Sequence, residues 1–257
     1  MQIISGSSCS RYYFDSGYKM ISEDDSNIVE VFYAKTKDLN SRYPDFKNYI
    51  TKEEQLRAER FHFEEDMETY ISCHALLRLV LSKTLNKEPL EVRFFNELYN
   101  KPALLGNPLY FNISHTKGAF AFVVSNNHYV GIDLEKVSKI IDFTSIIETY
   151  FSSCEREYIL ESKAEALDRF FLLWTRKEAL LKALGTGIID NLKQVEVLEN
   201  IIRREVFDNL IADCLFDDHF IYSTNLSNHF LSVAIPQRGK VLLYQINNEI
   251  INLYINQ

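Results

Sequence analysis

The chain has 257 residues and a formal net charge of −8 at pH 7, with 46% hydrophobic and 25% charged residues. This composition is typical of a globular protein, and the length suffices for one large domain or two small ones. An acidic chain without a concentrated basic stripe argues against nucleic-acid binding, and no apolar run approaches the length of a membrane-spanning helix.

The first half of the chain predicts one strand, two helices and then a group of strands. Apolar residues alternate over 28–35, which predicts a strand. Thr51 and Glu54 have the spacing of a capping box and mark the beginning of a helix. A longer helix is expected over about 64–85, with one buried apolar face. Further strands are expected at 92–95, 110–113, 119–125 and 129–136, with residues 126–128 joining the last two as a tight hairpin.

The second half repeats this order of helices followed by strands. Helices are expected near 143–151 and 154–162, and a long one over about 164–184 that ends at Gly185. Strands are expected at about 194–198, 219–224, 229–235 and 240–247. We therefore predict an α+β protein of two similar lobes, residues 1–125 and 126–257. The lobes should pack rigidly, because no low-complexity linker separates them.

Four residues from the two halves of this second lobe predict a site for a metal ion and a phosphate chain. Asp133 and Glu135 are two apart on a predicted strand, so both side chains leave the same face. Glu178 and Lys182 are four apart on a predicted helix, so they are neighbours on one helix face. Carboxylates of this kind suit Mg²⁺ shared with substrate phosphates. The alternative is a solvated sheet face beside a helix with a surface ion pair.

Three further stretches accompany these residues: 100–102 (Asn-Lys-Pro), 111–116 (Phe-Asn-Ile-Ser-His-Thr) and 151–155 (Phe-Ser-Ser-Cys-Glu). Together with 131–135 and 174–182 they resemble, in this order, the motifs of the Sfp-type 4'-phosphopantetheinyl transferases. The resemblance is clear over about 100–188 and looser over 57–85. Asn100 replaces the usual Gly, and Asn tolerates the positive φ of a turn best among the other residues. Thr116 replaces the usual Ser and keeps its hydroxyl.

The resemblance implies a fold of two α+β lobes with pseudo-two-fold symmetry, and transfer of the phosphopantetheine arm of coenzyme A to a serine of an apo carrier protein. Adenosine 3',5'-bisphosphate would be the other product. Lys182 would stabilise or protonate the leaving group, and Glu155 would accept the serine proton as general base. The implied metal ligands are Asp133, Glu135 and Glu178, and the implied coenzyme contacts are Arg57, Arg60, Lys101, Ser114, His115, Lys177 and Lys182.

Several of these residues also have a purely structural interpretation. His115 alone is a structural histidine about as often as a ligand contact. Lys101 can be an exposed turn lysine, and Glu155 a first-turn carboxylate that complements its helix dipole. Trp174 is expected to pack in the core. For the whole chain, the alternatives are a non-catalytic module that binds coenzyme A or a carrier, and a metal-dependent hydrolase of nucleotide pyrophosphates.

The expected cofactor is Mg²⁺, with Mn²⁺ as a substitute, and coenzyme A is the expected co-substrate. The expected partner is an acyl or peptidyl carrier domain, which we expect to bind near the residues after Gly187. Two paired lobes in one chain favour a monomer. The four cysteines, Cys9, Cys73, Cys154 and Cys214, are widely spaced, and the N-terminal residues lack the pattern of a signal peptide. We therefore expect a cytoplasmic protein.

Overall fold

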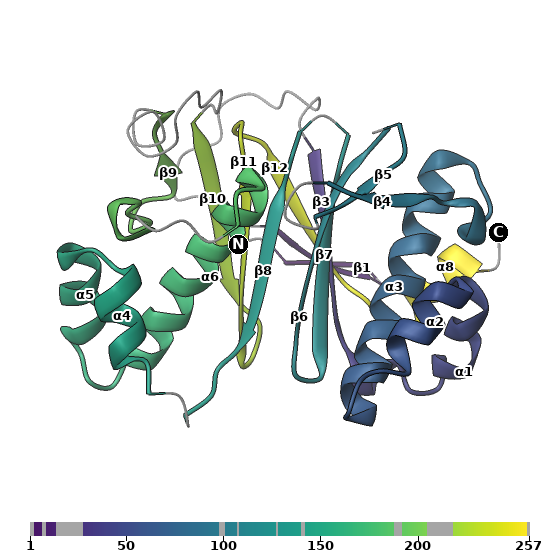
Figure 1. The fold of residues 1–257 in the computed structure, drawn as a ribbon, viewed down its shortest axis with the longest axis horizontal. Helices are drawn as coiled ribbons and strands as arrows, with labels where there is room; N and C mark the ends of the chain where they lie inside the picture. The colour runs from purple at the N-terminus through teal and green to yellow at the C-terminus, as the bar shows by residue number, and fades with distance from the viewer. Residues whose placement is uncertain are drawn as a thin grey trace.

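The computed structural model describes residues 3–6, 9–13, 28–97, 101–106, 108–126, 128–139, 142–187, 192–204 and 218–255. Two β-sheets lie at its centre, and helices cover their outer sides (Figure 1). The predicted α+β class with two sheet-containing lobes is confirmed. Within these ranges, none of the helices combines the length and the apolar character that crossing a bilayer requires.

The larger sheet has six strands in the order β1-β2-β12-β3-β7-β6. Its neighbouring strands are antiparallel, except β3 and β12, which run parallel. A separate antiparallel pair is formed by β4 and β5. The bounds are β1 Ile3–Gly6, β2 Cys9–Tyr13, β3 Ile28–Lys35, β4 Phe94–Asn96, β5 Pro102–Leu104, β6 Tyr110–Thr116, β7 Ala119–Ser125 and β12 Lys240–Gln245.

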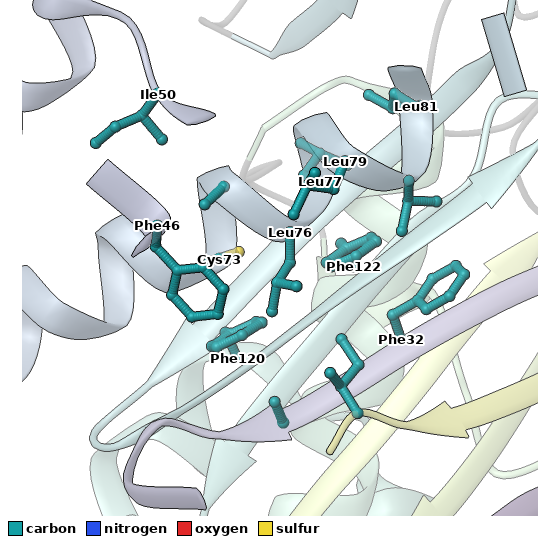
Figure 2. Packing of buried hydrophobic residues seen from close by; sticks show 14 of the residues in the cluster. Phe32, Phe46, Ile50, Cys73, Leu76, Leu77, Leu79, Leu81, Phe120 and Phe122 are labelled. Atoms are coloured by element: carbon teal, nitrogen blue, oxygen red, sulfur yellow. The ribbon is translucent and has the colours of Figure 1, made fainter. Parts of the chain in front are cut away.

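Helices on one side of this sheet build the first lobe around α3, which lies behind α2 in Figure 1. They are α1 (Tyr43–Phe46), α2 (Lys52–Ala58), α3 (Glu64–Leu85) and α8 (Asn248–Ile255), with 3₁₀ turns at Thr36–Leu39, Lys47–Tyr49 and Pro89–Glu91. Leu76 of α3 packs with Phe120 and Phe122 of β7, and Phe32 of β3 stacks on Phe122 at 4.9 Å between ring centroids (Figure 2). This aromatic packing fixes α3 on the sheet.

The smaller sheet has four strands in the order β8-β11-β10-β9, all antiparallel. Its long helix α6 lies across β8, β11 and β10. The bounds are β8 Gly131–Lys136, β9 Ile201–Ile202, β10 His219–Asn225, β11 His229–Ile235, α4 Thr144–Tyr150, α5 Ser153–Leu160 and α6 Ala166–Leu184, with a 3₁₀ turn at Leu192–Gln194. α6 ends where Gly185 adopts a left-handed conformation with φ 69°, as the sequence predicts.

The two sheets meet at their edge strands β6 and β8, and side chains of β6 join them. Asn112 Oδ1 accepts a hydrogen bond from the N–H of Ile132 at 3.0 Å. Two residues further along each strand, Ser114 Oγ accepts from the N–H of Leu134 at 3.1 Å. Alternate residues of a strand share one face, so the polar side chains on one face of β6 accept hydrogen bonds from the N–H groups at the open edge of β8.

Two of the sequence predictions are wrong. Residues 126–128 do not join β7 and β8 as a hairpin, because β7 pairs with β3 and β6 whereas β8 pairs with β11. The chain crosses from one sheet to the other at this point, although residue 127 itself lies outside the described residues. A strand was expected at 194–198, but the chain there follows a 3₁₀ turn and the short strand comes later, at β9.

The end of the described chain returns to the first lobe. β12 inserts between β2 and β3, and α8 packs against α3. The strand expected at 240–247 is thus confirmed as Lys240–Gln245. Its position means that the sheet of the first lobe contains strands from both ends of the sequence.

Candidate active site

The site begins where the backbones of β8 and α6 touch. A Cβ atom added to Gly131 would lie 2.0 Å from the carbonyl oxygen of Ala179 and 2.3 Å from the amide nitrogen of Ala183. Only glycine permits such an approach, since real side chains are excluded at these distances. The contact brings Asp133, two residues along β8, toward the face of α6 that carries Glu178 and Lys182.

Lys182 and Asp133 form an ion pair at the centre of this site. Lys182 Nζ lies 2.7 Å from Asp133 Oδ1, and the Asp133 side chain is only 5% exposed. Ser114 Oγ donates to the same carboxylate oxygen at 2.9 Å and accepts from Lys182 Nζ at 3.1 Å. The other oxygen of the carboxylate, Asp133 Oδ2, is buried and has no hydrogen-bond partner among the described residues.

Glu135 and Glu178 lie close enough to Asp133 to share its electrostatic field. Burial raises the pKa of Glu135 to about 7, and the charges of Asp133 and Glu178 contribute, although Lys182 opposes the shift. Burial and the charge of Asp133 also raise the pKa of Glu178. Three carboxylates that repel one another in a partly buried site need a cation to remain ionised together.

The chemistry of these donors fits a hard divalent cation. Mg²⁺ and Mn²⁺ prefer carboxylate oxygens, and the unpartnered Asp133 Oδ2 is a ligand atom that no protein donor uses. In the part of the chain that the structure describes, no three His, Cys, Asp or Glu side chains already stand at the spacing of a metal site. The ammonium group of Lys182 is the cation that the Asp133 carboxylate contacts.

His115 lies next to Ser114 but on the opposite face of β6, where its side chain is exposed. Desolvation lowers the pKa of His115, and the charge of Lys182 lowers it further, with smaller contributions from His74 and Arg57. Arg57 also lies over the ring of Tyr70, 5.7 Å from its centroid. The charges of Lys182 and Arg57 thus both act on His115, and the carboxylate of Asp66 opposes them. Arg60, beyond the end of α2, is exposed.

Lys101 reaches the C-terminal end of α6. Its ammonium group donates to the carbonyl oxygen of Lys182 at 2.5 Å and lies 3.5 Å from the carbonyl oxygen of Val130. Burial lowers the pKa of Lys101 to about 8. Its Nζ also lies 5.4 Å from the ring centroid of Tyr129, beside a small pocket that both side chains line. Lys101 thus complements the helix dipole and satisfies a terminal carbonyl group.

Glu155 and Lys177 form a separate ion pair, and both side chains are fully buried. Lys177 Nζ donates to Glu155 Oε2 at 2.9 Å, to the carbonyl oxygen of Leu192 at 3.2 Å and to that of Val195. The Glu155 carboxylate also accepts from the N–H groups of Ser152 and Val197, both at 2.9 Å. These bonds use all three protons of the ammonium group, so the geometry argues against a coenzyme contact by Lys177 and a general-base role for Glu155.

The sequence reasoning missed what Asn112, Ser114 and Thr116 do for the fold. Their side chains accept hydrogen bonds from three successive outward N–H groups of β8, those of Ile132, Leu134 and Lys136. The available signal was the alternation itself, since three polar residues at every second position of a strand share one face. A row of polar side chains on one face of a strand can therefore bind the N–H groups of a neighbouring strand edge, and it need not indicate a ligand site.

Comparisons with known proteins give a consistent result. A sequence model of the 4'-phosphopantetheinyl transferase superfamily matches residues 129–233, and one of the N-terminal region of 4'-phosphopantetheinyl transferases matches residues 17–128. The chain is 33% identical over 177 residues to the 4'-phosphopantetheinyl transferase HetI of Nostoc sp., a match that covers 67% of this chain and 74% of HetI. It is 31% identical over 145 residues to the 4'-phosphopantetheinyl transferase Sfp of Bacillus subtilis, covering 56% of this chain and 63% of Sfp.

A eukaryotic relative matches as well. The chain is 30% identical over 168 residues to the L-aminoadipate-semialdehyde dehydrogenase-phosphopantetheinyl transferase of Schizosaccharomyces pombe, covering 59% of this chain and 64% of that protein. Similarity therefore extends across both lobes and to relatives from bacteria and yeast.

Proposed function

The chain belongs to the 4'-phosphopantetheinyl transferase superfamily, and from this premise we propose how its site performs the transfer from coenzyme A to a carrier protein. The proposed reaction is attack of a carrier serine hydroxyl on the phosphorus atom next to the pantetheine arm. A new phosphorus–oxygen bond forms to the serine, and the bond to the bridging oxygen of the pyrophosphate breaks. The serine proton leaves, and adenosine 3',5'-bisphosphate departs with the bridging oxygen.

We assign Asp133, Glu135 and Glu178 as the residues that would hold Mg²⁺ or Mn²⁺. The observation that carries this assignment is their convergence at the crossing of β8 and α6, where one buried carboxylate oxygen has no partner and two carboxylates have raised pKa values. A bound divalent cation supplies charge neutralisation for the pyrophosphate.

Lys182 is the proposed catalytic cation. It stands beside Asp133 with a side chain that is 30% exposed, so its ammonium group can turn from the carboxylate toward a bound phosphate. A compact ammonium group stabilises the charge that develops on the bridging oxygen, and it can donate a proton there. The charges of Lys182 and Arg57 both act on His115, and we propose His115, Arg57 and Arg60 as coenzyme contacts.

Ser114 and Lys101 have more limited proposed roles. Ser114 holds Asp133 and Lys182 in place through two hydrogen bonds, so its proposed role is this positioning rather than a coenzyme contact. Lys101 approaches the site from the end of α6 and lines the pocket beside Tyr129.

Glu155 and Lys177 receive a structural role in this proposal. Their pair ties the beginning of α5 and the middle of α6 to the segment 192–197, which follows the long helix. The serine proton is then accepted by the partly exposed carboxylates beside Lys182, Glu135 or Glu178, and Glu155 takes no part. The enzyme would act as a cytoplasmic monomer, and its carrier would approach near the residues after Gly187, part of which lies outside the described ranges.

Mass spectrometry tests the proposal. The full chain is incubated with coenzyme A and Mg²⁺, with and without an apo carrier domain. A carrier that gains the mass of one phosphopantetheine arm supports transfer. Coenzyme cleavage without a carrier supports a pyrophosphate hydrolase, and binding without turnover supports a non-catalytic module. Asp133→Asn and Glu178→Gln should nearly abolish transfer and Mn²⁺ binding, whereas Glu148→Gln, an exposed carboxylate of α4, should change neither. Full activity of Asp133→Asn would contradict the metal assignment.

A further inference from the structure

Three polar residues form a row across the smaller sheet at the level of the proposed metal site. Asp133 of β8 is the register partner of Ser232 of β11, and Ser232 is the register partner of Ser223 of β10. Directly opposed residues of antiparallel strands have side chains on the same face. The face that carries Asp133 toward α6 therefore also carries two serine hydroxyl groups, in the middle of an apolar lobe.

These hydroxyl groups belong to one hydrogen-bonded chain that joins the sheet to α6. Arg176 Nε donates to Ser223 Oγ at 3.0 Å, and Ser223 and Ser232 are linked at 2.9 Å. Ser232 is linked to Thr175 Oγ1 at 2.8 Å, and Thr175 donates to the carbonyl oxygen of Leu172 at 3.0 Å. The side chains of Ser232 and Thr175 are completely buried, so water does not replace these bonds.

The direction of every proton in this chain is fixed by its two ends. A guanidinium N–H is only a donor and a carbonyl oxygen is only an acceptor. Thr175 gives its single proton to Leu172, so Ser232 must donate to Thr175, and Ser223 must donate to Ser232. The proton of Ser232 is therefore used within this network, on Thr175. The neighbouring Asp133 is not part of the network, and its buried Oδ2 has no hydrogen-bond partner among the described residues.

The Arg176 end of this hydrogen-bonded network is held by several contacts. The guanidinium group of Arg176 donates to the carbonyl oxygens of Val197 at 2.8 Å and Leu198 at 2.9 Å, and to Asn200 Oδ1 at 2.9 Å. Its Nε donates to Ser223. A planar group with several fixed donors restrains orientation more strongly than a single hydrogen bond.

On α6, the buried anchor and the functional residues lie on one stripe. Thr175, Glu178 and Lys182 are spaced by three and four residues, so they follow one another along the same helix face. A rotation of α6 that breaks the contact between Thr175 and Ser232 also turns Glu178 and Lys182 relative to Asp133. The glycine at position 131 lets α6 lie close to β8, and the hydroxyl network fixes the rotation of α6 about its axis.

We propose that the hydrogen-bonded network Arg176–Ser223–Ser232–Thr175 is a positioning device that sets the rotation of α6 on the sheet, so that Glu178 and Asp133 can bind one divalent cation. The inference rests on the proposed function, because it assigns a purpose to these residues only if the carboxylates hold a metal ion. Thr175 and Ser232 are positioning residues and do not touch the substrate.

The test compares Thr175→Val with a matched control, Thr69→Val. In the first lobe, Thr69 Oγ1 of α3 is linked to Thr36 Oγ1 at 2.8 Å and donates to the carbonyl oxygen of Glu65, so a buried hydroxyl group of the same kind is removed from the other lobe. Ser232→Ala removes the same link from the sheet side, and Thr175→Ser keeps the hydroxyl group. For each full-length variant we would measure the melting temperature, the Mn²⁺ dissociation constant in the presence of coenzyme A, and kcat and KM for transfer.

Thr175→Val and Ser232→Ala are expected to weaken Mn²⁺ binding by about tenfold or more, the usual effect of removing a residue that supports a metal ligand. Their kcat should fall while KM for coenzyme A changes little, and Thr175→Ser should restore both quantities. Thr69→Val should lower the melting temperature by a similar amount with unchanged Mn²⁺ affinity. If Thr175→Val and Thr69→Val lose stability equally and both retain wild-type Mn²⁺ affinity and kcat, the inference is overturned while the proposed function stands. A wild-type chain that neither binds Mn²⁺ nor transfers overturns both.

Discussion

Replacing Lys177 by Met tests whether the buried pair with Glu155 is structural. Methionine keeps most of the length of the side chain but removes the charge and all three donors. Glu155 would then be a buried carboxylate that retains only the N–H groups of Ser152 and Val197, and the carbonyl oxygens of Leu192 and Val195 would lose the ammonium donor. Removing one partner of a buried ion pair costs about 3–5 kcal/mol, because the other charge remains in the interior.

That loss is large compared with the ordinary stability of a protein. Natural domains are stable by about 5–15 kcal/mol, so Lys177→Met is expected to remove about a fifth or more of the free energy of unfolding. At about 2–4 °C per kcal/mol for a chain of this size, the melting temperature should fall by roughly 6–20 °C. Urea denaturation at fixed pH measures the loss directly, and transfer assays at low temperature report on the molecules that remain folded.

Two further variants decide between structure and catalysis. Glu155→Gln should also destabilise the fold, and it lowers the pKa of Lys177 further, because burial already lowers that pKa and the charge of Glu155 opposes the shift. The double variant should lose less free energy than the sum of the single losses, since it leaves no unpaired charge. The reasoning is refuted if Glu155→Gln unfolds at the wild-type urea concentration but has lost its kcat, which is the behaviour of a general base.

Three other predictions follow from the geometry. Gly131→Ala forces α6 away from β8, so stability should fall by about 1–3 kcal/mol or more and Mn²⁺ affinity should fall with it, as calorimetry can measure. Lys182→Ala should lower kcat more than it weakens coenzyme binding; an effect on KM alone would make Lys182 a binding residue. Burial raises the pKa of Glu54, but hydrogen bonds from His74, Arg78 and Thr51 and the charge of Arg78 outweigh this and lower it to about 2. The bonds to ionised Glu54 therefore contribute about 3 kcal/mol to the free energy of unfolding above pH 4.5, and this contribution is lost as the pH falls toward 2. In Glu54→Gln, the free energy of unfolding from urea titrations should depend less on pH in that range.

Local sequence signals predicted the elements that local interactions determine. The helix Glu64–Leu85 and the strands Ile28–Lys35, Ala119–Ser125 and His229–Ile235 have the predicted bounds, because apolar period and flanking breakers act within the segment. The connection after β7 was predicted wrongly for the opposite reason. A short polar turn between two apolar runs has the same sequence whether the strands pair with each other or enter different sheets.

The parallel pairing of β12 with β3 was also beyond the reach of local reasoning. These strands are more than two hundred residues apart, and their pairing depends on which sheet edge is open after the rest of the chain has folded. The sequence predicted that residues 240–247 form a strand, but it contains no local signal for the strand's neighbour. Partner choice is a tertiary property, so only the three-dimensional structure reveals it.

The candidate site shows the same division between local and tertiary information. Spacing alone predicted that Asp133 and Glu135 share a face and that Glu178 and Lys182 are neighbours, since both follow from backbone geometry. Spacing did not reveal that Lys177, one residue before Glu178, points to the other side of α6 and is fully buried. A step of one residue turns a helical side chain by about 100°, so adjacent motif residues face different surroundings.

The number of unused hydrogen-bond donors and acceptors distinguishes motif residues that are free to bind a ligand from motif residues that hold the fold together. Ser114 uses its proton on Asp133 and accepts from Leu134 and Lys182, so its hydroxyl group has no capacity left for a ligand. Lys177 has likewise used all three of its protons inside the fold. Asp133 differs, because a buried carboxylate oxygen that lacks a partner costs free energy and is retained only where something else binds it. Motif residues with unused, desolvated capacity are therefore the ones that we expect to meet the metal ion and the coenzyme, and the saturated residues are those that hold them in place.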